Sequence, residues 1–135
     1  MRRLVHILLA LAAIPVPAWA ETIVPPAKFE RMTSGKTLYF DRGGQPYGAE
    51  TYLANRQVLW RYSDGTCSTG HWFEDAGNIC FVYDATPLPQ CWIFVERDGE
   101  FFARTLGTPS EDISEIRLAG ESPEPLDCPA PNLGF

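Results

Sequence analysis

The side chains best placed to do chemistry surround His71, the one histidine of the sequence beyond its first twenty residues. A nucleophilic triad would need His71 as the base, a serine as the attacking group and a carboxylate to orient the imidazole. The serines and acids near it in the sequence are Ser63, Ser68, Asp64, Glu74 and Asp75. The chain contains no G-x-S-x-G nucleophile elbow, and a histidine followed by Trp72 is typical of a half-exposed strand. We therefore expect that the protein is not an enzyme.

Carboxylates near the ends of the predicted strands offer a second kind of chemistry. They are Asp41, Glu50, Asp64, Glu74 and Asp84. Two carboxylates at a suitable separation can hydrolyse glycosides, but acids at strand ends are usually solvated turn residues. Gly43-Gly44 lacks the lysine and helix of a phosphate loop, and residues 75–78 lack the ligand series of a calcium loop. We expect no cofactor and no metal site.

The cysteines Cys67, Cys80, Cys91 and Cys128 are even in number and contain no C-x-x-C pair. A tetrahedral zinc site would need more histidines than the region around them supplies. In an exported chain, such a set favours two disulfides over free thiols. No cysteine is then free to act as a nucleophile.

The first twenty residues have the pattern of a signal peptide. Arg2 and Arg3 precede an apolar run over 4–14, and the triplet Ala18-Trp19-Ala20 supplies the small residues of a cleavage site. The run is shorter than the roughly 20 apolar residues that span a bilayer. We expect cleavage after Ala20, export to the periplasm or the medium, and no membrane span.

The charge balance argues against nucleic acid as a partner. The 135 residues include 17 acidic and 11 basic side chains, for a net charge of -6, whereas nucleic-acid affinity comes mainly from clustered lysine and arginine. We expect the partner to be an envelope or secreted protein.

From Gly35 to Gly107 the sequence repeats one pattern, a short run of aromatic and β-branched residues followed by a turn. The runs cover 36–40, 47–53, 57–62, 67–73, 78–83, 90–96 and 100–105. We predict an all-β fold: an antiparallel meander of about seven strands over 35–107 that forms a small barrel or half-barrel, because closure removes exposed strand edges. Residues 21–34 are predicted as an extended N-terminal arm, and 108–135 as an acidic, proline-rich C-terminal segment.

Turn positions suggest a register for the middle strands. A turn centred on Ala76 places Trp72 opposite Cys80, and a loop centred between Ala85 and Thr86 places Cys80 opposite Cys91. This favours a disulfide between Cys80 and Cys91 and leaves Cys67 with Cys128, out of three possible connectivities. The second bridge would tie the C-terminal segment back to the sheet.

Both faces of these strands are apolar. The face predicted as core carries Trp72, Cys80, Val82, Cys91, Ile93 and Val95, and the opposite face also carries Ile79. The aromatic residues of that opposite face are Phe81, Tyr83, Trp92 and Phe94. They are either covered by other parts of the chain or form a candidate binding surface.

The C-terminal segment contains one helix signal. Thr108-Pro109-Ser110-Glu111 fits a capping box and predicts a short helix as far as about Arg117. Without that box, Ile116 to Leu118 would be a strand fragment.

The order of these motifs resembles a known family. Gly70-His71-Trp72, a cysteine strand from Gly77 to Tyr83, Gln90-Cys91-Trp92 and a hairpin from Asp98 to Phe102 resemble small exported proteobacterial proteins known only as a domain of unknown function. The resemblance covers 35–107 and implies a periplasmic β-meander or lipocalin-like barrel. It implies no activity and no functional residue.

Three functions fit these expectations. The first is a non-catalytic binding or interaction module of the cell envelope that uses the aromatic face. The alternatives are an inhibitor of a secreted hydrolase, such as a lysozyme or protease, that presents Glu74 and Asp75, and a small-ligand carrier. Trp60, Tyr62 and Trp72 are bulky enough to predict an interior filled by side chains, which disfavours the carrier.

Overall fold

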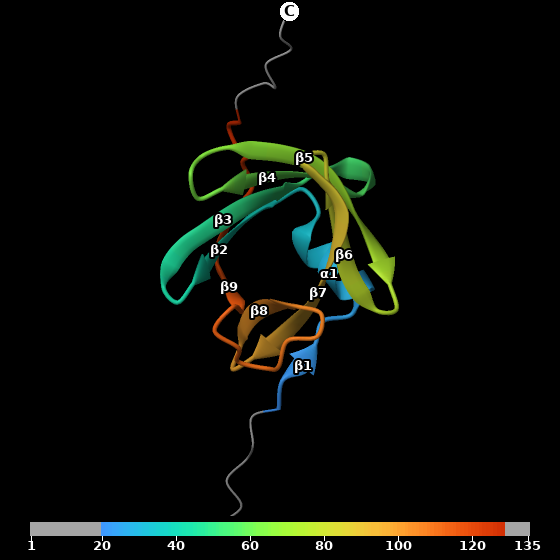
Figure 1. Cartoon of the computed structure of the whole chain (residues 1–135), viewed down its shortest axis with the longest axis vertical. Helices are drawn as coiled ribbons and strands as arrows, with labels where there is room; N and C mark the ends of the chain where they lie inside the picture. The colour runs from blue at the N-terminus through green and yellow to red at the C-terminus, as the bar shows by residue number, and fades with distance from the viewer. Residues whose placement is uncertain (1–19, 129–135) are drawn as a thin grey trace, which may run out of the picture.

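The computed structural model describes residues 20–128, and they form a closed antiparallel β-barrel with one short helix (Figure 1). The elements are β1 (Thr22–Ile23), α1 (Pro26–Thr33), β2 (Thr37–Arg42), β3 (Gln45–Tyr52), the 3₁₀ turn η1 (Ala54–Arg56), β4 (Gln57–Tyr62), β5 (Cys67–Asp75), β6 (Asn78–Tyr83), β7 (Thr86–Arg97), β8 (Glu100–Thr105) and β9 (Ile116–Ser122). The eight strands β2 to β9 make the barrel, and β1 pairs with the end of β7. The predicted all-β meander is confirmed.

Strand β9 closes the barrel because it pairs with β2 on one side and with β8 on the other. The predicted meander of about seven strands thereby has eight strands in the barrel, and the predicted helix from Thr108 to about Arg117 is wrong. Residues 106–115 form turns and irregular structure, and Ile116 is buried at the start of β9. Without β9, the facing edges of β2 and β8 would leave backbone N–H and C=O groups unpaired. That cost outweighs the local preference of a capping box, so part of the predicted C-terminal segment belongs to the barrel.

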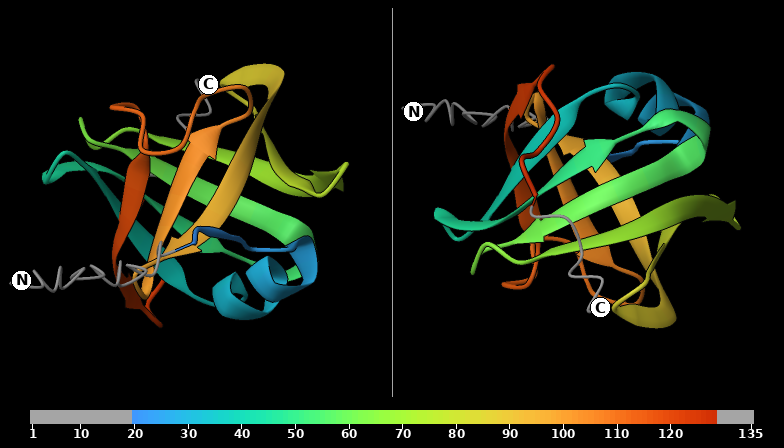
Figure 2. Two further views of the ribbon diagram at one scale, coloured as in Figure 1. Left: turned by 90° about the horizontal axis from the view of Figure 1, so that it is seen from below. Right: turned by 90° about the horizontal axis from the view of Figure 1, so that it is seen from above.

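The predicted N-terminal arm over 21–34 is mostly helical, because α1 packs into one end of the barrel. Pro26 begins the helix, where a missing N–H costs nothing. Phe29 is fully buried, and its ring makes edge contacts with Tyr52 and Trp72, with centroids 5.6 and 5.2 Å away. The two views in Figure 2 place α1 at one end of the barrel and the β6–β7 hairpin at the other. One end is thus plugged by the chain itself.

The register of the middle strands differs from the predicted one by a single residue. The turn after β5 has Ala76 and Gly77 at its centre, both with positive φ (48° and 81°), as a two-residue hairpin turn requires. Trp72 therefore lies opposite Phe81, whereas Cys80 still lies opposite Cys91. A one-residue shift exchanges the two faces of a strand. Trp72 faces the interior together with Phe81, and the face predicted to lie opposite the core is the inner face.

Two disulfides join Cys80 to Cys91 and Cys67 to Cys128. The first links β6 to β7, and the second ties the chain after β9 to β5. Disulfides persist in oxidising compartments, so they point to a site outside the cytoplasm. Of the predicted leader over 1–20, residues 1–19 lie outside the described residues. Within 20–128, no helix is long and apolar enough to cross a membrane.

Candidate functional site

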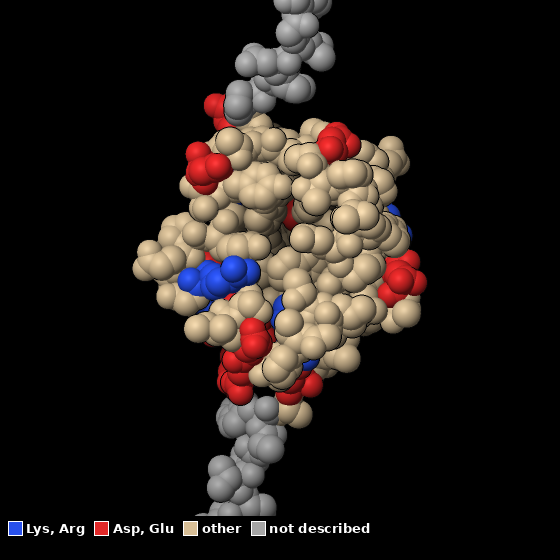
Figure 3. All heavy atoms as spheres, viewed as in Figure 1, with Lys and Arg blue, Asp and Glu red and all other residues tan. Residues whose placement is uncertain are grey.

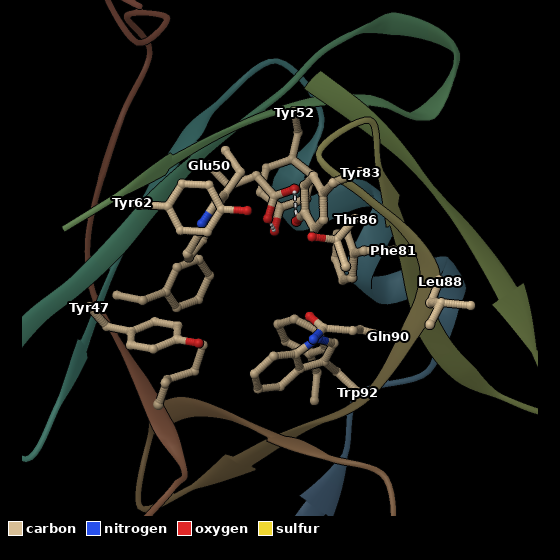
Figure 4. Close-up of a pocket in the computed structure, with 14 residues that line it drawn as sticks. Tyr47, Glu50, Tyr52, Tyr62, Phe81, Tyr83, Thr86, Leu88, Gln90 and Trp92 are labelled. Carbon is tan, nitrogen blue, oxygen red and sulfur yellow. Dashed lines mark hydrogen bonds between the residues drawn. The ribbon is translucent and has the colours of Figure 1, made fainter. Parts of the chain in front are cut away.

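The barrel holds a cavity of about 230 Å³ in its interior. It opens on the face seen in Figure 3, where acidic atoms are visible at the bottom of the central hollow. Its lining side chains, most of them labelled in Figure 4, are Phe40, Tyr47, Glu50, Tyr52, Trp60, Tyr62, Phe81, Tyr83, Thr86, Leu88, Gln90, Trp92, Phe94 and Ile116. The expectation of a filled interior is therefore wrong, since Trp60 and Tyr62 line the space and do not fill it.

Small residues at inward positions make room for this cavity and its rings. A Cβ added to Gly48 would lie 2.2 Å from the Trp60 ring, so only glycine lets that indole lie flat against β3. Next to it, the pairing of β2 with β3 shifts between Phe40 and Asp41 and leaves Tyr47 as an extra residue. Such a β-bulge re-aims a side chain. Tyr47 thereby joins the inward-facing lining although it is the direct neighbour of Gly48.

Gly70 on β5 likewise leaves room for an aromatic ring. It lies opposite Tyr83, and a Cβ at this position would lie 2.3 Å from the Val82 carbonyl oxygen and 2.8 Å from the Tyr83 ring. The absence of a side chain at Gly70 lets the Tyr83 ring lie across β5. The ring carries its hydroxyl to the floor of the cavity, where it reaches Glu50.

Glu50 is the acidic group at the cavity floor, and its residue is only 3% exposed. Its Oε1 accepts a hydrogen bond from the Tyr83 hydroxyl at 2.9 Å, and its Oε2 accepts a longer one from the Tyr52 hydroxyl at 3.5 Å (Figure 4). In the part of the chain that the structure describes, no basic side chain forms an ion pair with Glu50. The carboxyl group is held by hydroxyl groups alone.

Burial without a cation changes the ionisation of this group. It raises the pKa of Glu50 to about 8, although the hydrogen bonds from Tyr83 and Tyr52 oppose the rise. Burial and the nearby Glu50 charge also raise the pKa of both tyrosines well above the usual range. Near neutral pH the cavity floor therefore presents a largely protonated Glu50 carboxyl group and the neutral phenols of Tyr52 and Tyr83.

The residues considered for a triad are not brought together. Alternation along β5 places Ser68 on the inner face with Trp72, and His71 on the exposed outer face. The Ser68 hydroxyl accepts a hydrogen bond from the Ala85 N–H at 3.3 Å. The remaining candidates, Ser63, Asp64, Glu74 and Asp75, are exposed.

The five carboxylates considered as a glycosidase pair are also separated. Asp41 pairs with Arg117 at 2.6 Å, and Asp64 accepts hydrogen bonds from its neighbour Thr66. Asp84 accepts a hydrogen bond from the Thr69 hydroxyl, and Glu74 is exposed. Of the five, Glu50 alone lines the cavity. Because it lies in the middle of β3 and not at a strand end, the expected solvated turn does not describe it.

The predicted binding residues Phe81, Tyr83, Trp92 and Phe94 share one face as expected, and all four line the cavity. They come from β6 and β7, and they join rings from β2, β3 and β4 that the sequence did not connect with them. The signal that could have identified the cavity is the pair of strand glycines Gly48 and Gly70, since glycine within a strand marks a close approach.

One cluster of metal-ligand residues is present among residues 20–128, namely Asp75, Cys80 and Cys91. The two sulfurs form the β6–β7 disulfide. A disulfide sulfur is not a thiolate, and the thiolate is the form that ligates metals.

A second polar region lies around Glu21, just before β1. Its carboxylate accepts hydrogen bonds from Arg104 at 2.6 Å and from Arg97 at 3.0 Å, and from the Ser110 hydroxyl at 2.6 Å. Glu115 pairs with the same two arginines. The hydrogen bond from Arg104 is the largest effect that lowers the pKa of Glu21, to about 2. This arginine cluster fastens the segment before β1, and the loop before β9, to β7 and β8.

Comparison with models of protein families, with curated proteins and with solved structures found no significant match. The chain's small disulfide-bonded barrel has the form that the lipocalin-like resemblance implies, and the function is not identified by any relative.

Proposed function

We propose that the protein is an exported, non-catalytic binding module that holds a small organic molecule inside its barrel. The observation that carries the proposal is the aromatic cavity with one acidic group, Glu50, at its floor. Ligand sites are typically concave and mostly apolar, with few polar groups that orient the ligand. The leader pattern and the two disulfides support a location in the cell envelope.

The same observation ranks the small molecule above a protein partner. The aromatic residues of β6 and β7 that the sequence suggested as a partner surface face inward, where a folded protein does not reach. The hydrolase-inhibitor alternative would depend on Glu74 and Asp75, which are exposed beside the β5–β6 turn. No described contact distinguishes these two acids from ordinary solvated turn residues.

The cavity size sets the scale of the ligand. An apolar cavity of roughly 150 Å³ accepts benzene, and the cavity here has about 230 Å³. It therefore fits one ring with a short substituent. Thr86, Leu88 and Gln90 line it and are exposed, so they mark its mouth.

Titration calorimetry with three one-ring probes, benzyl alcohol, benzylamine and benzoate, tests the proposal. We expect at least one probe to bind the wild type. Gln90→Trp should block the mouth and abolish that binding. Gln57→Trp is the matched control, because Gln57 is exposed and lies on β4 next to the inward-facing Val58. No binding of any probe to the wild type, or equal binding to both variants, would overturn the proposal.

A further inference from the structure

The feature that the proposed function leaves unexplained is a buried carboxyl group without a cation. Three other partly buried acids in the described chain have arginine partners: Glu21 and Glu115 contact Arg97 and Arg104, and Asp41 contacts Arg117. Glu50 is buried more deeply than Glu21, yet it contacts only hydroxyl groups. Burying an acid in this way costs free energy unless something compensates for it.

The hydrogen bonds at Glu50 suit its ionised form. Both carboxyl oxygens face a tyrosine hydroxyl, and a carboxylate is a pure acceptor that takes up both donors. The floor of the cavity is thus prepared for a negative charge, and no basic side chain among residues 20–128 pairs with it. Arg42, which lies over the Tyr47 ring at 4.2 Å, does not line the cavity.

The aromatic walls of the cavity are suited to bind an organic cation. Nine of the lining residues are aromatic: Phe40, Tyr47, Tyr52, Trp60, Tyr62, Phe81, Tyr83, Trp92 and Phe94. Aromatic ring faces attract organic cations, most strongly where water is excluded. Figure 4 shows rings on several sides of the space below the Glu50 carboxyl group. The stacking of Arg42 on Tyr47 indicates that a ring of this lining already accepts a cation.

We infer that the ligand of this cavity is a monocationic organic amine built around one ring, whose ammonium group pairs with the Glu50 carboxylate while the rings enclose the rest. The inference rests on the proposed function and narrows it to one class of ligand. The acidic balance of the chain, with a net charge of -6, favours the approach of such a cation.

Amine binding also predicts a proton balance. Besides Glu50, the titratable side chains that line the cavity are Tyr47, Tyr52, Tyr62 and Tyr83. Burial raises the pKa of Tyr52 and Tyr83, the two that contact Glu50, so they keep their protons. When an ammonium ion pairs with Glu50, the carboxyl proton passes to the solvent, the amine keeps its own proton, and no covalent bond forms. Binding at pH 7 should therefore release close to one proton for each amine bound.

The three one-ring probes test the inference on the wild type, without any variant. Benzylamine should bind about tenfold or more tightly than benzyl alcohol, and benzoate should not bind. Calorimetry in buffers of different ionisation enthalpy should show the proton release with benzylamine and none with the alcohol. If benzyl alcohol binds as tightly as benzylamine, the amine inference fails while the proposed function stands. If no probe binds, both fail.

Glu50→Gln supplies the second arm, since an amide keeps the shape of the side chain and can still accept hydrogen bonds. This variant should lose the preference for benzylamine over benzyl alcohol, and benzylamine binding should no longer release a proton. An unchanged preference would overturn the inference. If the variant does not fold, the ranking of probes on the wild type decides the question.

Discussion

The cavity floor and the arginine cluster around Glu21 shift the pKa of a glutamate carboxyl group in opposite directions. Glu50 lies deep in the barrel with hydroxyl groups only, and burial raises its pKa to about 8. Glu21 is partly exposed and accepts hydrogen bonds from two arginines, chiefly Arg104, which lower its pKa to about 2. The cluster is complete within the chain and holds segments together. Among the described residues, Glu50 has no such cation partner, which is why we propose a binding site there and only a structural role for the arginine cluster.

The largest expected effect on stability comes from replacing Glu50, the buried acid at the cavity floor. Because the pKa of Glu50 is higher in the folded state than the ordinary value of 4.5, its unfolded form ionises first as the pH rises. The contribution of Glu50 to the free energy of unfolding is therefore fully present below pH 4.5 and is lost as the pH rises toward 8. With roughly 1.4 kcal/mol for each pKa unit, the loss of stability is about 5 kcal/mol once the pH exceeds 8.

Glu50→Gln should remove this loss, so that the variant gains stability relative to the wild type between pH 5 and pH 9. Urea unfolding at several pH values would measure the difference. Glu74→Gln is a suitable control, because Glu74 is exposed on β5. A wild type and a Glu50→Gln variant with parallel pH profiles would show that Glu50 is not buried as described.

A smaller effect of opposite sign is expected at the arginine cluster. Since the pKa of Glu21 is lowered in the folded state, its contribution is present above pH 4.5 and is lost as the pH falls toward 2. We expect Glu21→Gln to cost roughly 2 kcal/mol at pH 7 and to approach the wild type near pH 2. The urea midpoint would report both values. A cost that does not change with pH would contradict the assignment of the stability to the ion pairs.

The smallest expected effect comes from Tyr83→Phe, which tests how much the hydrogen bonds at Glu50, as distinct from its burial, contribute to stability. Tyr83→Phe removes the donor at 2.9 Å, so the pKa of Glu50 should rise further. At pH 9, where the carboxylate is ionised, the variant should lose about 1 kcal/mol of stability. Tyr62→Phe is the matched control, since Tyr62 lines the same cavity and is half exposed. The pH dependence of unfolding would distinguish the two, and identical profiles would remove Tyr83 from the site.

Much of the strand content could be predicted because it depends on local pattern. The runs 57–62, 78–83 and 100–105 match β4, β6 and β8 at both ends. Alternating apolar residues and turn signals operate within a few residues of one another. The Cys80–Cys91 pairing could be derived for the same reason, as both cysteines lie on one hairpin.

The candidate site could be predicted only in part. The shared face of Phe81, Tyr83, Trp92 and Phe94 follows from the period of two along a strand. Its direction toward the interior depends on the two-residue turn at Ala76 and Gly77, and a shift of one residue was enough to invert it. Glu50 could not be distinguished from four other acids, because its burial depends on contacts with β4 and β6 that are distant in sequence.

The sequence by itself determined the all-β class, the positions of most strands and the cysteines available for two bridges. These follow from residue type and short spacing. The tertiary structure alone decided that α1 plugs one end, that β9 closes the barrel and that Glu50 lines a cavity where no described basic side chain pairs with it. Each of these outcomes depends on burying side chains and pairing strand edges between segments far apart in the chain, and only the closed barrel brings those segments together.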